Sequence, residues 1–325
     1  MVKVRHILIV QTIMIILLAF ASVYFYSQMQ KFNGSQPQDY SLLSKKISYG
    51  AMEEKSLAIV NFNPLKIVLE DHTRGRGINT SIYVENLRNG AYMGIGERNE
   101  YLPASLNKLV LAILIMKKVE EGKLSLDSEL KISESDRLSS SGELYRTTDD
   151  EIPLNIVIEK LLSESDNTAF SILLHYVTEE DIEFILDYYN LDISLDFEGG
   201  ESRKHSNTIS PKSMSNLFLS LYFSTVLEAK NSEYLLSLMK DNVFDINQIA
   251  GLPEGVEVAH KFGEHYLNST KIFHDCGIMY AAESRIFYCI MSKDMEKEDS
   301  VENAAFITRS IYEYVNAVKV KYGTK

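Results

Sequence analysis

The sequence has no excess of basic residues and no cluster of metal-ligating side chains. Its 325 residues include 33 Lys and Arg against 45 Asp and Glu, a formal net charge of −12. This balance excludes the basic footprint of a nucleic-acid-binding protein, and acidity by itself indicates solubility without naming a partner. The seven histidines are scattered, with none at ligand spacing from a cysteine or carboxylate. We therefore predict no metal, no other cofactor and no nucleic-acid partner.

Cysteine is scarce, with only Cys276 and Cys289 in the chain. The segments 272–280 and 285–292 read as two strands around a short turn. Pairing Tyr280 with Arg285 in this hairpin would place the two cysteines opposite each other. An exported protein can oxidise such a pair, but free cysteines are also common in protein cores. The sequence leaves both alternatives open.

Long hydrophobic runs are also few, and the most prominent one lies at the N-terminus. Basic residues at positions 3 and 5 precede an apolar run over residues 7–26. Twenty helical residues span about 30 Å, the thickness of a bilayer core, and the basic flank would keep the N-terminus cytoplasmic. Residues 19–21, Ala-Phe-Ala, resemble a signal-peptidase site, so cleavage near Ala21 is the alternative. We favour a single-pass membrane anchor over residues 1–26, with the rest of the chain extracytoplasmic.

The remaining sequence indicates a stalk or linker over residues 27–62 and one folded domain over residues 63–325. Strand patterns occur near both ends of this domain, and helical patterns lie between them. This order predicts the α/β (α+β) class: an antiparallel sheet flanked by helices, with an all-helical subdomain. Strands are expected at 78–86, 91–95, 256–262, 272–280 and 285–292, and helices at 65–71, from 105 through 116, 152–162, 168–177, 179–189, 212–223, 231–241 and 301–320.

A candidate nucleophile lies at the start of the most apolar of these helices. Ser105 and Lys108 are three residues apart, so they lie one turn apart on the same helix face. This spacing places an amine beside a hydroxyl, which is the arrangement of a lysine-assisted serine nucleophile. The pattern also occurs at Ser128 and Lys131, in a polar segment without a helix signature, and we assign no role to that pair.

Two later motifs single out position 105. Ser-Asp-Asn stands at residues 165–167, and Lys-Phe-Gly stands at residues 261–263. Together with Pro-Ala-Ser-x-x-Lys at 103–108 and His-Asp-x-Gly-Ile at 274–278, this ordered set resembles the class A β-lactamases and the related penicillin-binding proteins. The resemblance covers roughly residues 64–320. It implies a β-lactamase/transpeptidase-like fold and a serine hydrolase.

The resemblance also implies a role for each matching residue. Ser105 would attack a carbonyl, Lys108 would help to remove its proton, and Ser165 would pass a proton to the leaving nitrogen. Asn167 would hold the substrate amide, and Lys261 would supply positive potential for a substrate carboxylate. The backbone N–H groups of Ser105 and of Glu264, which follows Gly263, would form the oxyanion hole, where each donor is worth roughly 3 kcal/mol.

The sequence departs from this family pattern at two points. Class A β-lactamases carry a glutamate that activates the deacylating water, and here only Glu201 and Glu198 stand near the expected place. The stretch from Glu201 to Pro211 is too short for a full omega loop, so both are weak candidates. In the third motif Phe262 replaces the usual threonine, whose hydroxyl helps to bind the substrate carboxylate. The first change affects deacylation, and the second affects substrate recognition.

Three functions are compatible with these observations. The first is a membrane-anchored class A β-lactamase-like hydrolase that opens β-lactams through a Ser105 acyl-enzyme. The second is a peptidoglycan D,D-peptidase or penicillin-binding protein with slow deacylation, acting on peptidoglycan-derived peptides. The third is a non-catalytic surface protein that uses the same fold for binding. A labelled β-lactam distinguishes them, because turnover, persistent labelling and no labelling are different outcomes.

Overall fold

The computed structural model describes residues 20, 23–24, 40–44, 61–75, 77–195, 206–267, 270–281 and 284–322. The chain divides into two compact units, Met1–Ser41 and Leu42–Lys325. Most of the predicted anchor, 1–26, and of the predicted stalk, 27–62, lies outside the described residues. Within the described ranges, no helix is both long and apolar enough to span a bilayer.

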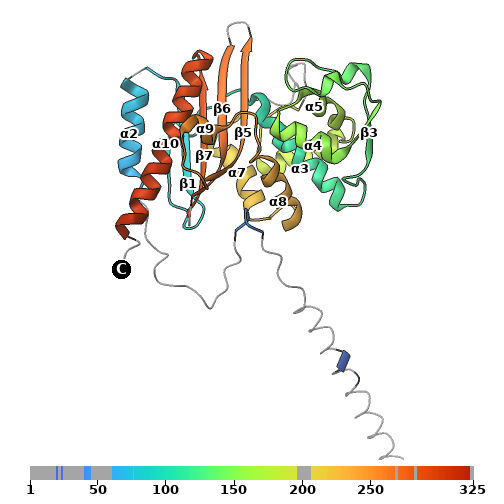
Figure 1. The fold of residues 1–325 in the computed structure, drawn as a ribbon, viewed down its shortest axis with the longest axis horizontal. Helices are drawn as coiled ribbons and strands as arrows, with labels where there is room; N and C mark the ends of the chain where they lie inside the picture. The colour runs from blue at the N-terminus through green and yellow to red at the C-terminus, as the bar shows by residue number, and fades with distance from the viewer. Residues whose placement is uncertain are drawn as a thin grey trace, which may run out of the picture. The chain divides into compact units, whose positions relative to one another are not determined.

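The second unit contains a five-stranded antiparallel sheet in the order β2-β1-β7-β6-β5. Two strands come from the start of the domain sequence and three from its end, which confirms the predicted sheet and fold class. Figure 1 shows β5 on the side that faces helices α3–α5. The strands are β1 (Thr80–Asn86), β2 (Tyr92–Ile95), β5 (Glu257–Leu267), β6 (Thr270–Ala281) and β7 (Ser284–Lys293).

The predicted register of the β6–β7 hairpin is confirmed. Tyr280 pairs with Arg285, and Cys276 pairs with Cys289 and forms a disulfide with it. The free-thiol alternative is therefore wrong. Strand β5 runs beyond the predicted limit at residue 262, because its backbone pairs with β6 as far as Leu267 although the side chains there turn polar. Side-chain patterning alone does not report such pairing.

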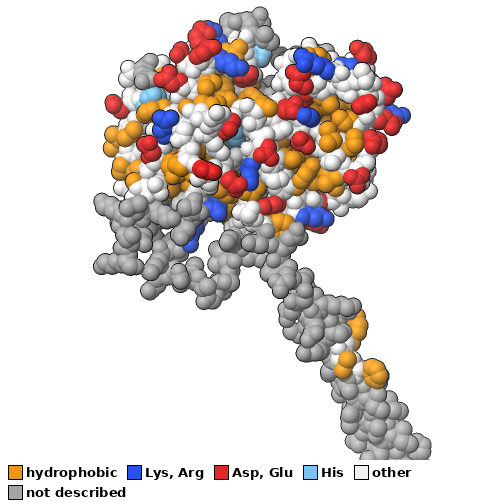
Figure 2. All heavy atoms as spheres, in the orientation of Figure 1, with side chains coloured by type: hydrophobic (Ala, Val, Ile, Leu, Met, Phe, Trp, Pro, Cys, Tyr) orange, Lys and Arg blue, Asp and Glu red, His pale blue; other side chains and the backbone are white. Residues whose placement is uncertain are grey.

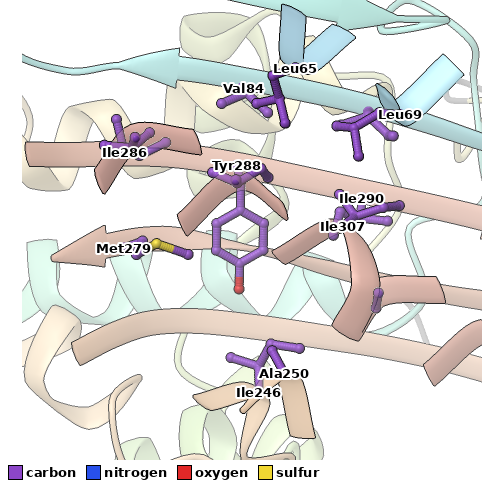
Figure 3. Packing of buried hydrophobic residues seen from close by; sticks show 14 of the residues in the cluster. Leu65, Leu69, Val84, Ile246, Ala250, Met279, Ile286, Tyr288, Ile290 and Ile307 are labelled. Atoms are coloured by element: carbon purple, nitrogen blue, oxygen red, sulfur yellow. The ribbon is translucent and has the colours of Figure 1, made fainter. Parts of the chain in front are cut away.

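One face of the sheet is covered by α2 (Asn63–Gly75), α9 (Ile246–Ala250) and α10 (Lys297–Tyr322). Leu65 and Leu69 of α2 meet Ile82, Val84 and the inward side chains of β7 in one apolar cluster. Figure 3 shows the Tyr288 ring within this cluster, near Ile286, Ile290 and Met279. Burial of these side chains at about 25 cal/mol per Å² of apolar surface holds the helices on the sheet.

The opposite side of the sheet meets the helical part of the domain (Figure 1). At its centre lies α3, in which residues 108–116 are all buried, with Lys108 as the charged member of that run. Helices α4 and α5 contact α3, and α7 contacts β7. The helices are α3 (Asn107–Glu120), α4 (Leu154–Ser163), α5 (Asn167–Leu174), α6 (Glu179–Tyr189), α7 (Pro211–Tyr222) and α8 (Ala229–Leu238), with the short strands β3 (Glu129–Lys131) and β4 (Glu151–Pro153) beside them.

The compact unit begins before the predicted domain boundary at residue 63. Leu42 and Leu43 are buried, and the Tyr280 hydroxyl donates a hydrogen bond of 2.9 Å to the Leu42 carbonyl. The Leu42 N–H donates to the Glu233 carboxylate of α8. Residues that the sequence assigns to a polar stalk thus pack onto the folded domain.

The face shown in Figure 2 mixes acidic and basic side chains with hydrophobic ones.

Candidate active site

Ser105 stands in a one-turn 3₁₀ helix, Ala104–Leu106, directly before α3. Ala104 has a φ of +46°, a left-handed conformation that costs an L-residue about 1–3 kcal/mol. The His274 imidazole of β6 makes a hydrogen bond of 2.8 Å to the Leu102 carbonyl. This contact fixes the backbone directly before the turn. The serine is therefore presented by a strained turn that the sheet supports.

Gly263 allows β5 to lie directly against that turn. A Cβ atom on Gly263 would stand 3.1 Å from the Ser105 backbone nitrogen and 3.2 Å from the Pro103 carbonyl oxygen. The next residue, Glu264, directs its carboxylate away to Lys297 of α10, at 2.7 Å. The backbone of β5 thus reaches the Ser105 turn at the position where the sequence predicts the oxyanion donors.

Lys108 is the centre of the polar contacts in this site. Its Nζ donates to Ser105 Oγ at 3.2 Å, to Ser165 Oγ at 3.2 Å and to Asn167 Oδ1 at 2.6 Å. It also donates to the Ser165 carbonyl. The structure therefore brings Ser105, Lys108, Ser165 and Asn167 together, although 62 residues separate the first from the last.

The surroundings of Lys108 make its amine unusually easy to deprotonate. The residue is 2% exposed, and all four of its hydrogen-bond acceptors are uncharged. Burial lowers the pKa of Lys108 to about 7, and the negative charge of Asp166 opposes this shift. A lysine that is partly neutral near pH 7 can accept a proton from a neighbouring hydroxyl.

The Ser-Asp-Asn segment joins α4 to α5, and its first residue has a left-handed backbone conformation. Ser165 has a φ of +56°, which lets both its carbonyl and its hydroxyl face Lys108. Asp166 caps α5 by accepting the Ala169 N–H at 2.9 Å, and it also accepts the Leu144 N–H at 2.8 Å. Burial raises the pKa of Asp166. Asp166 holds the segment in shape, while its two neighbours face the site.

A loop that the sequence motifs do not include holds this segment from outside. The Ser140 hydroxyl accepts a hydrogen bond of 2.7 Å from Asn167 Nδ2, and the Ser141 carbonyl accepts the Asn167 N–H at 3.0 Å. A Cβ on Gly142 would lie 1.9 Å from an Asp166 oxygen, so only glycine fits there. The only sequence signal for this role is a run of small residues at 139–142, which is typical of any loop.

Lys261 lies on β5 and is completely buried, with 0% exposure. Its Nζ donates to the Phe262 carbonyl at 2.9 Å and stands 4.6 Å from the centre of the Phe262 ring. Burial, with the nearby charge of Lys108, holds the pKa of Lys261 well below its usual value. Among the described residues, neither Lys108 nor Lys261 forms an ion pair with a carboxylate.

Glu201 and Glu198, the remaining sequence candidates for the site, lie outside the described residues. The second Ser-x-x-Lys pair is built differently from the first, because Ser128 Oγ accepts the Ser125 N–H at 2.9 Å and Lys131 ends the short strand β3. In the described part of the chain, no group of three or more metal-ligating side chains comes together.

Comparison with known proteins identifies the family. A model described as "Beta-lactamase enzyme family" matches residues 65–315, which is most of the chain. The β-lactamase VEB-1 of Pseudomonas aeruginosa is 22% identical over 262 residues, covering 75% of this chain and 87% of that protein.

Solved structures show the same fold. The extended-spectrum β-lactamase TLA-1 superposes with a TM-score of 0.70 at 21% identity, over 79% of this chain and 99% of its own. PBP-A superposes with a TM-score of 0.69 at 20% identity, over 78% and 97%. The chain belongs to the beta-lactamase enzyme family and is a serine hydrolase.

Proposed function

Starting from this family membership, we propose that the protein is an extracytoplasmic β-lactamase-like hydrolase that opens a β-lactam or a related amide through an acyl-enzyme on Ser105. The observation that carries this proposal is the Lys108 amine, 3.2 Å from both Ser105 Oγ and Ser165 Oγ, with a pKa near 7. One amine in contact with two hydroxyls can accept a proton from the nucleophile and supply one toward the leaving group.

The acylation step follows from these contacts. Lys108 takes the Ser105 proton as Oγ attacks the substrate carbonyl carbon, and the backbone N–H groups of Ser105 and Glu264 stabilise the oxyanion. As the C–N bond breaks, the proton passes from Lys108 through Ser165 Oγ to the departing nitrogen. Asn167 holds the substrate amide through its side chain. The product is an ester on Ser105, with no net change in protons.

Hydrolysis of that ester requires a second base. Glu201 is the sequence candidate, with Glu198 as the weaker one, and neither has support from a described contact. The side-chain partner of Ser105 Oγ among the described residues is the Lys108 amine. The second candidate function is a penicillin-binding protein or D,D-peptidase whose acyl-enzyme persists, and the chain shares the fold of PBP-A.

The location of the protein is part of the same proposal. The apolar run over residues 7–26 would act as the membrane anchor, with the catalytic domain outside the cytoplasm, where β-lactams and peptidoglycan-derived peptides are available. The buried Cys276–Cys289 disulfide supports an oxidising compartment.

The intact mass of the full-length protein after incubation with benzylpenicillin tests the proposal. A mass increase equal to the whole antibiotic that disappears with time indicates turnover. A persistent increase indicates the penicillin-binding alternative. The increase must be absent in Ser105→Ala, and labelling that survives this substitution would contradict the assignment of the nucleophile.

A further inference from the structure

The aromatic ring of Phe262 lies against the amine of Lys261, the lysine that would meet a substrate carboxylate. Lys261 Nζ is bounded by two parts of its neighbour: the Phe262 carbonyl at 2.9 Å and the Phe262 ring centre at 4.6 Å. Lys261 itself is 0% exposed. A cation above an aromatic face is stabilised by the ring's negative face without any anion.

Neighbouring aromatic rings hold Phe262 in place. Its side chain is 8% exposed, and its ring centre lies 5.5 Å from that of Phe244, in the segment before α9. Phe244 in turn packs edge-on against Phe273 of β6, with ring centres 5.2 Å apart. The Phe244 backbone N–H is held by Asn242 Oδ1 at 3.0 Å. Moving the Phe262 ring away from Lys261 would disturb this row of rings.

The charges around the site lead to the same conclusion. Within the described ranges, no carboxylate pairs with Lys261, whose pKa is held well below its usual value by burial and by Lys108. A substrate carboxylate would have to lose its hydration to meet an amine that is fully buried beside an apolar ring. An uncharged group in the same place carries no charge whose hydration must be removed.

From this arrangement we propose that Phe262 is a specificity-determining residue, which makes the site prefer acyl donors without a free carboxylate beside the scissile amide. This inference rests on the proposed acylation of Ser105 and names the substrate class for that site. Neutral amides and esters, including esterified β-lactams, would acylate Ser105 at least as fast as the corresponding acids.

Two substrates that differ only at the carboxylate test this proposal: benzylpenicillin and its methyl ester. We measure the second-order rate of Ser105 acylation by intact mass, using the full-length protein. In wild type, the ester should react at least as fast as the acid. In Phe262→Thr, which removes the ring and adds a hydroxyl, the acid-to-ester rate ratio should rise by about tenfold or more, because the amine becomes accessible to the carboxylate.

Two further variants keep the test informative. Phe262→Leu removes the aromatic face but retains apolar bulk, so it should fold where Phe262→Thr does not and should raise the ratio by a smaller factor. Phe306→Leu changes a ring that stacks on His72, on the α10 side of the domain, and should leave the ratio unchanged. Folding of each variant is checked by thermal unfolding.

The outcomes separate this inference from the proposed function. Absence of acylation by both compounds in every variant would overturn the proposed function itself. Acylation of wild type by the acid faster than by the ester would overturn the inference and leave the nucleophile assignment intact. An acid-to-ester ratio that does not change in Phe262→Thr or Phe262→Leu would also overturn it.

Discussion

Two buried polar groups lie on opposite faces of the same sheet and differ in how their charges are balanced. On the α10 side, His260 Nδ1 and the Asp275 carboxylate are 2.6 Å apart, and Tyr288 donates to the second Asp275 oxygen at 2.6 Å. On the other side, the amines of Lys108 and Lys261 have only uncharged acceptors among the described residues. The carboxylate of the first group has its hydrogen-bond partners within the fold. The two amines of the second group have no ion-pair partner among the described residues.

This difference separates a structural role from a functional one. A buried carboxylate with a hydrogen-bond partner at each oxygen is satisfied within the fold and needs no ligand. A buried amine without an ion-pair partner destabilises the fold, and it persists where a reaction uses its lowered pKa. The comparison predicts that changes on the two faces will affect different properties, and the following substitutions test this from the largest expected effect to the smallest.

Ser105→Ala should abolish acylation, with a loss of at least about 10⁴-fold, because the substitution removes the attacking Oγ atom. Its effect on stability should be small, since the side chain is only partly buried. The measurement is intact mass with a β-lactam, together with thermal unfolding. Ser128→Ala, in the second Ser-x-x-Lys pair, is the matched control and should retain full labelling.

Lys108→Met should separate activity from stability. Acylation should fall by roughly 10²–10⁴-fold because the proton acceptor is lost. The free energy of unfolding should rise by about 1–2 kcal/mol, because a buried amine is replaced by an apolar side chain of similar length. Denaturant unfolding measures this gain, and a loss of stability would contradict the view that Lys108 is retained for reaction and not for folding.

The sign of the pH effect on that stability follows from the lowered pKa. In the unfolded chain Lys108 is protonated up to its ordinary pKa near 10.4, whereas in the folded protein it loses its proton at about 7. Burial of the charged amine therefore costs most below pH 7, and the cost declines as pH rises. The stability gain of Lys108→Met should be larger at pH 6 than at pH 9.

Asp275→Asn, on the α10 side of the sheet, should lower stability and leave acylation intact, which is the reverse of the effects expected for Lys108→Met. The free energy of unfolding should fall by about 2 kcal/mol, which lowers Tm by roughly 4–8 °C for a domain of this size, because His260 and Tyr288 lose a carboxylate partner. Acylation of the folded protein should continue. Tyr288→Phe removes one donor and should cost only about 1 kcal/mol. Loss of labelling in a stably folded Asp275→Asn protein would show that the two faces are not independent.

The last prediction concerns the pH dependence of wild-type acylation. Lys108 accepts a proton only when it is neutral, so the acylation rate should decrease about tenfold for each pH unit below 7 and level off above it. Single-turnover labelling from pH 5 to 9 measures this profile. A rate that stays flat from pH 5 to 7 would exclude Lys108 as the proton acceptor.

Much of the fold could be predicted because its signals are local. The hairpin that pairs Cys276 with Cys289 follows from the alternation of its two strands and the turn between them. Helix α7 begins at Pro211 behind the cap Ser210, a pattern visible in the sequence. For the site, the order of three short motifs selected Ser105 and Lys108 over the decoy at 128–131.

By itself, the sequence determined the class of the fold, the strand register of the hairpin and the residues that meet around Lys108, since these depend on periodicity and on motif order. Only the tertiary structure decided how those residues behave. The pKa of Lys108 near 7 and the hydrogen bond from Asn167 to Ser140 arise from burial and from contacts between distant segments. The position of the Phe262 ring beside Lys261 depends on its packing against Phe244. Desolvation depends on what surrounds a group in three dimensions, and residue order along the chain does not specify it.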